Sequence, residues 1–169
     1  MSTAERRNEL FGRLKFVTAI SAAIAGLDLV SKILAEVSLS GDPLALTSFM
    51  NLRLGFNPGI SYGLFPMTSA SGVAVLLGVQ TIIVTAMFIF AARSGSSWEQ
   101  GALGLIIGGA VGNVIDRARD GVVTDFLDLH VQGWHWPTFN VADVAITLGA
   151  GLLLWNTLRP LDAARVAAD

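Results

Sequence analysis

The sequence contains no cysteine and few charged residues, and each shortage excludes a class of site or partner. Without cysteine the chain has no disulfide, no thiolate nucleophile and no cysteine-ligated metal. Charged residues make up 14% of the chain, against about 25% in a typical soluble domain. The formal charge of −2, with no basic patch, gives no reason to expect a nucleic-acid partner. The chain is instead 53% hydrophobic, which is typical of an integral membrane protein.

Four apolar runs account for this excess, at about 16–34, 72–92, 98–117 and 139–158. Each approaches the roughly 20 residues that a helix needs to cross a bilayer core. We therefore predict an all-α membrane protein, in which residues 1–169 form a single domain with four transmembrane helices. Ala23-Ile24-Ala25 resembles a signal-peptide cleavage site, but the apolar pattern continues past it, which favours a retained span. In the third run, Gly104, Gly108 and Gly112 repeat every four residues and predict close approach of another helix.

The predicted outer loops, 35–71 and 118–138, carry two strand-like patterns. Apolar residues alternate with polar or small ones around 52–56 and 127–131, which is the period of a half-buried strand. Asn57-Pro58-Gly59 and Gln132-Gly133 predict turns. We expect a small extracytoplasmic β-element between the helices.

Three local features point to other chemistry but lack the context that it needs. Residues 59–63 match the G-x-S-x-G nucleophile elbow, which requires an α/β sheet that four spans cannot build. His130 and His135 have no metal-binding spacing, so we expect neither a metal nor a cofactor. Trp134 and Trp136 are typical of an interfacial aromatic belt.

The basic residues predict the orientation of the chain. Seven of the eleven Lys and Arg flank the side that holds both termini: Arg6, Arg7, Arg13, Lys15, Arg93, Arg159 and Arg165. The positive-inside rule then puts the termini in the cytoplasm. The outer ends of the spans collect the remaining polar groups: Asp28, Lys32, Asn57, Asn113, Asp116, Arg117, Asp125, Asn140 and Asp143. Because ionisable groups at the edge of a span are costly, we interpret this set as one functional site.

Two carboxylates, Asp125 and Asp143, stand where a loop meets an apolar helix. Two carboxylates that face one water share a proton, as in aspartic proteases. The residues alone leave a structural alternative open, in which Asp125 pairs with Arg117 or Arg119 and Asp143 only caps its helix. Asp28 and Lys32 lie one helical turn apart, and they fit either the site or an ion pair that snorkels to the interface.

Five short motifs, taken together, resemble the lipoprotein signal peptidase (signal peptidase II) family of bacteria. They occur in the family's order: Leu27-Asp28 with Ser31-Lys32, Asn57-Pro58-Gly59, Gly112-Asn113-Val114-Ile115-Asp116-Arg117, Val122-Val123-Thr124-Asp125-Phe126 and Phe139-Asn140-Val141-Ala142-Asp143. The resemblance implies an aspartyl endopeptidase of the inner membrane, with its active site at the outer face. Such enzymes cleave a prolipoprotein just before its diacylglyceryl-modified cysteine.

By this resemblance Asp125 and Asp143 are the catalytic pair, and the other motif residues bind substrate or support the pair. The supporting set is Asp28, Lys32, Asn57, Gly59, Asn113, Asp116, Arg117 and Asn140. The implied partners are the prolipoprotein, membrane lipid and the inhibitor globomycin.

Two other functions remain as alternatives. The same aspartates would serve as a proton relay in a small transporter, although transporters tend to show internal repeats and midplane sites, and no repeat is visible here. A non-catalytic assembly or lipid-binding protein would use the glycine stripe but would leave Asp143 without a role.

Overall fold

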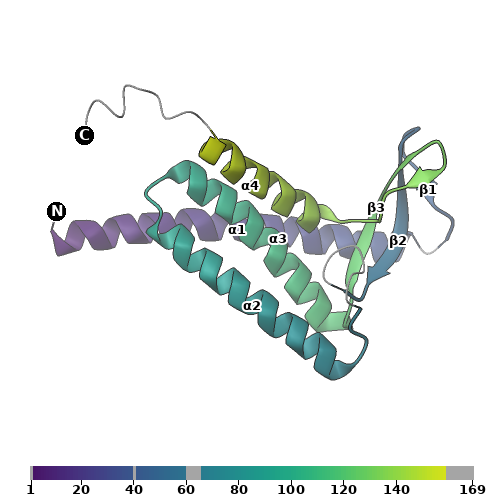
Figure 1. Cartoon of the computed structure of the whole chain (residues 1–169), viewed down its shortest axis with the longest axis horizontal. Coiled ribbons are helices and arrows are strands. Elements are labelled where there is room, and N and C mark those ends of the chain that lie inside the picture. The colour runs from purple at the N-terminus through teal and green to yellow at the C-terminus, as the bar shows by residue number, and fades with distance from the viewer. Residues whose placement is uncertain (1, 40, 60–65, 159–169) are drawn as a thin grey trace.

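Four helices run alongside one another, and a small sheet lies at one end of them (Figure 1). The structure, a computed structural model, describes residues 2–39, 41–59 and 66–158. The helices are α1 (Thr3–Ser38), α2 (Ala70–Arg93), α3 (Ser97–Asp120) and α4 (Val141–Leu158). The described part of the G-x-S-x-G match is Gly59 alone; residues 60–63 lie outside the described residues.

Serine side chains begin three of the helices. Ser2, Ser69 and Ser96 each accept a hydrogen bond from a backbone N–H of the first turn, and Ser2 forms a full capping box with Glu5. Such caps satisfy amides that have no partner inside the helix. At its other end α3 stops at Gly121, whose φ of +77° only glycine adopts readily.

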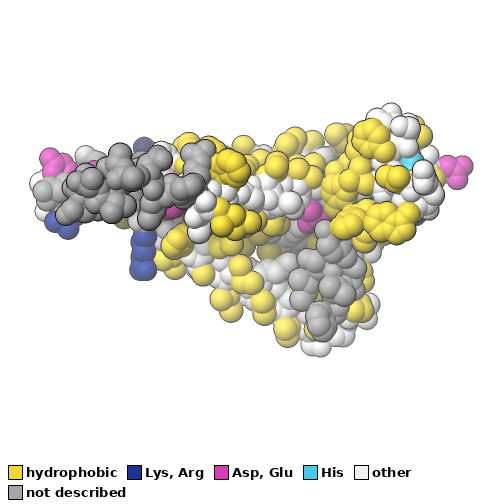
Figure 2. Space-filling view, turned by 45° about the horizontal axis from the view of Figure 1, so that its top comes forward, with side chains coloured by type: hydrophobic (Ala, Val, Ile, Leu, Met, Phe, Trp, Pro, Cys, Tyr) yellow, Lys and Arg dark blue, Asp and Glu magenta, His cyan; other side chains and the backbone are white. Residues whose placement is uncertain are grey.

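Three helices in the described part of the chain are long and apolar enough to cross a membrane: α1, α2 and α4. The third predicted span, α3, is 24 residues long but carries glycines and charged residues that lower its hydropathy. It lies at the centre and packs against the other three helices, so most of its apolar surface is buried within the protein. Figure 2 shows hydrophobic side chains along the outside of the molecule, with basic side chains toward the end where α1 begins.

The predicted glycine stripe of α3 does face another helix. A Cβ on Gly108 would lie 2.8 Å from the backbone oxygen of Ser21 in α1, and one on Gly104 would lie 2.9 Å from Ile20. Gly109, on a second face, similarly lies against the backbone of Ala142 in α4. The absent side chains let α3 approach both neighbours at backbone distance.

The β-element is an antiparallel sheet in the order β1-β2-β3-β4. Its strands are β1 (Leu44–Ala45), β2 (Met50–Asn57), β3 (Val123–Val131) and β4 (Trp134–His135). Both predicted strand patterns are confirmed, and the predicted Gln132-Gly133 turn joins β3 to β4 with positive φ at both positions. An irregularity between Leu52 and Gly55 shifts the register, so that Gly55 pairs with Asp125 and Asn57 with Val123.

Candidate active site

Asn140 connects the two candidate carboxylates. Asn140 directly precedes α4, and its side-chain amide donates to Oδ1 of Asp125, in strand β3, at 2.7 Å. Its backbone N–H donates to Asp143 Oδ2 at 3.3 Å, and the N–H of Asp143 donates back to Asn140 Oδ1 at 3.0 Å. This reciprocal cap fixes Asp143 in the first turn of α4, while the other end of Asn140 holds Asp125.

Asn113 of α3 is the second connection. Its amide donates to Asp143 Oδ1 at 3.2 Å. Its oxygen accepts from the Lys32 ammonium at 2.7 Å and from Asn140 at 3.2 Å. The accepted hydrogen bonds determine which side of the Asn113 amide faces Asp143, so Asp143 meets a donor.

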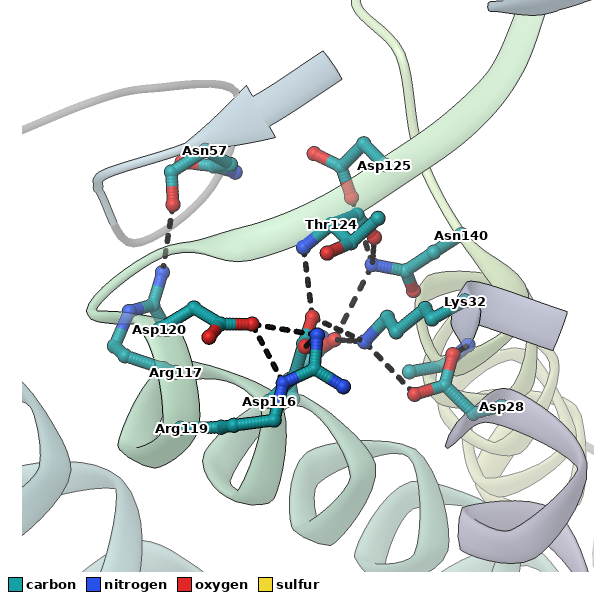
Figure 3. A network of polar contacts seen from close by, with 12 residues as sticks. Asp28, Lys32, Asn57, Asp116, Arg117, Arg119, Asp120, Thr124, Asp125 and Asn140 are labelled. Atoms are coloured by element: carbon teal, nitrogen blue, oxygen red, sulfur yellow. Dashed lines mark hydrogen bonds and ion pairs between the residues drawn. The ribbon is translucent and has the colours of Figure 1, made fainter. Parts of the chain in front are cut away.

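A buried cation lies behind these amides. Lys32 Nζ lies 2.8 Å from Asp28 Oδ2 and 3.4 Å from Asp116 Oδ2, and all three side chains are 1% exposed or less (Figure 3). The snorkelling interpretation of the Asp28–Lys32 pair is therefore wrong. A buried charge is tolerated only with partners, and here two carboxylates and Asn113 surround the ammonium.

Arg117 belongs to a separate group on the other side of Asp116 (Figure 3). Its guanidinium donates to the backbone carbonyls of Asn57, at 3.3 Å, and Gly59, and to Gln80 Oε1 at 3.2 Å. The Asn57 side chain accepts from the Gly59 N–H at 2.9 Å, as expected for the predicted turn. Arg117 thus fastens the end of β2 to α3 and α2.

The alternative in which Asp125 pairs with an arginine and Asp143 only caps its helix is correct only for the cap. Within the described residues Asp125 makes no ion pair with either arginine, because Arg117 binds carbonyls and Arg119 pairs with Glu36, Asp116 and Asp120. Asp143 does cap its helix, but it also faces Asn113.

A cavity of about 410 Å³ opens beside Asp143. Its remaining wall is largely apolar, and its polar lining comes from seven residues: Asn57, Gln80, Asn113, Arg117, Thr138, Asp143 and Thr147. Such a mostly apolar cavity with a few convergent polar groups is the usual form of a ligand site.

Asp125 is set up to hold a proton near neutral pH. Burial raises its pKa to about 7, and the neighbouring charge of Asp143 adds to the rise. Hydrogen bonds from Asn140 and Asn57 and the charge of Lys32 oppose it. A carboxyl group with this pKa serves as an acid and a base at physiological pH.

Three residues of the site were not predicted as part of it. Thr124 is 1% exposed, donates its N–H to Asp116 at 2.7 Å and donates its hydroxyl to Glu36 at 2.9 Å. Gln80, the only strongly polar side chain of its apolar run, binds Arg117. The isolated position of Gln80 in an apolar run could have indicated its role, whereas nothing in the sequence around Glu36 indicated one.

Comparison with known proteins agrees with the motifs. A family model described as signal peptidase (SPase) II matches residues 20–159, which includes every candidate residue. The chain belongs to the signal peptidase II family.

The signal peptidase II relatives cover most of this chain. A protein named lipoprotein signal peptidase from Janthinobacterium sp. (strain Marseille) is 39% identical over 145 residues, covering 83% of this chain and 86% of the relative. One of the same name from Methylobacterium sp. (strain 4-46) is 42% identical over 149 residues, covering 83% and 90%.

Solved structures show the same fold. Two, each described as a bacterial membrane enzyme structure by the in meso method, are similar with TM-scores of 0.77 and 0.74. The first is 26% identical to this signal peptidase II family member, and the match covers 87% of this chain and 90% of the solved one. The second is 28% identical, and the match covers 85% of this chain and 92% of the solved one.

Proposed function

We propose that this chain removes signal peptides from prolipoproteins, with Asp125 and Asp143 as the aspartyl pair that hydrolyses the peptide bond. The observation that carries the proposal is the bridge through Asn140, which binds both carboxylates beside a cavity that Asp143 lines. Family membership supports the reaction, and the names of the relatives support the substrate. By the same family resemblance, the cleaved bond precedes a diacylglyceryl-modified cysteine, and globomycin competes for the site.

The raised pKa of Asp125 assigns the proton in this proposal. Asp125 begins protonated, and ionised Asp143 accepts a proton from water as the water oxygen attacks the scissile carbonyl carbon. The tetrahedral intermediate collapses when Asp125 protonates the amide nitrogen and the C–N bond breaks. The products are the carboxyl end of the signal peptide and the free amine of the cysteine.

The remaining residues divide into two roles. Asn113 and Asn140 orient the carboxylates, and the buried Lys32, with Asp28 and Asp116, orients Asn113. Arg117 already binds the Asn57 and Gly59 carbonyls, so we assign it to holding the β2 end of the cavity. The side chain of Asn57, which lines the cavity, is then the group placed to meet the substrate backbone.

The decisive experiment replaces each aspartate by asparagine. Asparagine keeps the size of aspartate but exchanges no proton, and general acid–base steps contribute about 10²–10⁴-fold. Asp125→Asn and Asp143→Asn should each nearly abolish cleavage of a diacylglyceryl prolipoprotein, without adding in the double variant. Asp42→Asn, at an exposed aspartate, is the matched control. Full cleavage by either site variant, or chelator-sensitive activity that zinc restores, would refute the aspartyl mechanism.

We further propose that residues 1–169 form one membrane domain with four spans, α3 included, and with both termini cytoplasmic. The length of α3, its packing against all three apolar helices and the basic residues near the start of α1 support this topology. A cysteine at Gly95 should then be protected from an impermeant thiol reagent in intact cells, and one at Gln132 should react; both positions are exposed in the structure. The reverse labelling would overturn the orientation and the outer-face site.

A further inference from the structure

Thr138 lines the cavity beside Asp143, although it lies outside every motif of the sequence. It belongs to the segment between β4 and α4, next to a residue that β3 holds in place. The N–H of Phe139 donates to the Leu127 carbonyl at 3.1 Å, and the Phe139 carbonyl accepts from the Leu127 N–H at 2.8 Å. Neighbouring side chains of a strand-like segment point to opposite sides, so this pairing turns Phe139 away from the cavity and Thr138 toward it.

Gly55 leaves room for the Thr138 hydroxyl next to Asp125. In the sheet, Gly55 of β2 is the register partner of Asp125 in β3. A Cβ on Gly55 would lie 2.9 Å from Oγ1 of Thr138 and 3.6 Å from the backbone oxygen of Asp125. The shorter of these contacts is too close for a real Cβ, so a side chain at Gly55 would displace the hydroxyl. The hydroxyl therefore stands beside the strand that carries Asp125, in the cavity that Asp143 lines.

The Thr138 hydroxyl is an uncommitted donor. Within the part of the chain that the structure describes, no hydrogen bond reaches its oxygen. Other donors of the cavity are already held: the Asn113 amide binds Asp143 at 3.2 Å, and the Arg117 guanidinium binds backbone carbonyls. Thr147 also lines the cavity, but it lies one helical turn beyond Asp143, about 6 Å further along α4. Thr138 thus offers its hydroxyl at the end of the cavity where the carboxylates lie.

The proposed reaction needs such a donor. When water adds to the scissile carbonyl carbon, the carbonyl oxygen becomes an oxyanion. Asp143 takes a proton from the water, and Asp125 keeps its own proton for the leaving nitrogen, so neither group neutralises the oxyanion in this scheme. An anion without a hydrogen-bond donor is costly in a largely apolar cavity, and a donor that is already in place there lowers the barrier.

We propose that the Thr138 hydroxyl donates a hydrogen bond to the oxyanion of the tetrahedral intermediate, which makes Thr138 a third catalytic residue. The inference rests on the proposed function, because it uses the same attack of water and the same aspartates. The hydroxyl keeps its own proton throughout, so the proton transfers among water, the two aspartates and the leaving amine are unchanged. Since this hydrogen bond strengthens as charge develops on the oxygen, it acts on kcat rather than on KM.

Removal of the hydroxyl tests the proposal. Thr138→Val keeps the branched shape and should lower kcat by about 10²-fold, as for the loss of one oxyanion donor, with little change in KM. Thr138→Ser keeps a hydroxyl and should restore most of kcat. Thr81→Val is the matched control and should retain wild-type kcat, because this exposed hydroxyl binds only the Leu77 carbonyl of its own helix. A thermal unfolding midpoint for each variant establishes that it is folded.

Gly55→Ala tests the same hydroxyl from the neighbouring strand. The added Cβ displaces the hydroxyl, so Gly55→Ala should lower kcat in the wild type. It should lower kcat much less in Thr138→Ala, where only the Thr138 Cβ position remains, 3.8 Å away at an ordinary contact distance.

Three results would overturn the oxyanion role and leave the aspartyl pair in place: wild-type kcat in Thr138→Val, a loss confined to KM, or equal effects of Gly55→Ala with and without the hydroxyl. Absence of cleavage by the wild type would instead contradict the proposed function.

Discussion

The carboxylate of Asp28, in α1, caps α4 by accepting a hydrogen bond from the backbone N–H of Ala142 at 2.8 Å. The first N–H groups of a helix have no partner within it, and the helix dipole favours a negative charge there. The other oxygen of Asp28 lies 2.8 Å from Lys32. Asp143 directly follows the capped residue, so α1 determines where this carboxylate stands.

This relationship predicts different outcomes for two substitutions of Asp28. Asp28→Asn keeps an oxygen for Ala142 but leaves Lys32 with one carboxylate fewer. Asp28→Ala also removes the cap, which costs about 0.5–2 kcal/mol more. Both should lower thermal stability, because breaking a buried ion pair costs about 3–5 kcal/mol. Asp28→Ala should lower both the thermal unfolding midpoint and the cleavage rate more than Asp28→Asn does. Identical behaviour of the two variants would contradict the capping role.

The pKa of Asp125 predicts an alkaline limit to activity. If Asp125 must begin protonated, kcat/KM should fall as the pH rises through about 7, the pKa of this carboxyl group. The hydrogen bond from Asn140 favours the ionised form, so its loss should raise the midpoint. Asn140→Ser retains a side-chain cap for α4 but is too short to reach Asp125. A pH–rate profile of the variant whose alkaline midpoint is unchanged or lower would count against Asp125 as the acid.

Much of the site could be predicted because its residues interrupt apolar runs. Asp28, Asn113 and Asp143 are conspicuous in helices where each polar group is costly, and the strand patterns follow a simple period. The sequence does not reveal the partners of each group. Lys32 looked able to reach solvent along its helix, yet the approach of α3 at Gly112, where a Cβ would lie 2.5 Å from Asp28, closes that side.

For α3, the packing could be predicted from the sequence, but the membrane span is less clear. Its glycines predicted a close contact, and that contact is present, but the same glycines lower its hydropathy below that of the three clearly apolar helices. From the sequence, Arg117 looked free to bind substrate. Its actual partners, the backbone carbonyls of Asn57 and Gly59, lie 60 and 58 residues away in the chain. Such distant backbone partners leave no pattern in the side chains.

Close helix packing predicts opposite signs for two glycine-to-alanine changes in α3. Gly101 has nothing within 4 Å of an added Cβ, so Gly101→Ala should be neutral or stabilising by up to about 1 kcal/mol. Gly108→Ala would place its Cβ 2.8 Å from the Ser21 oxygen and should destabilise by about 1–3 kcal/mol. Thermal midpoints in detergent measure the difference. Equal shifts would mean that α1 and α3 separate without cost.

Thr124 predicts a positioning effect on its neighbour Asp125. Each polar group of Thr124 is bound: its N–H by Asp116 at 2.7 Å, its hydroxyl by Glu36 at 2.9 Å and its carbonyl by Asn140 at 3.3 Å. Thr124→Val keeps the shape and removes only the hydroxyl. A hydrogen bond to a charged group is worth about 1.5–3 kcal/mol, so kcat should fall at least about tenfold if that bond holds Asp125 in place.

The controls for this prediction separate position from stability. Thr124→Ser keeps the hydroxyl and should restore most of kcat. Glu36→Gln should reduce kcat less than Thr124→Val, because its amide oxygen still accepts from Thr124. The double variant should be no worse than Thr124→Val alone, since both changes act on one hydrogen bond. Additive losses, or an effect confined to KM, would show that Glu36 and Thr124 act separately and that the Thr124 hydroxyl does not hold Asp125 in place.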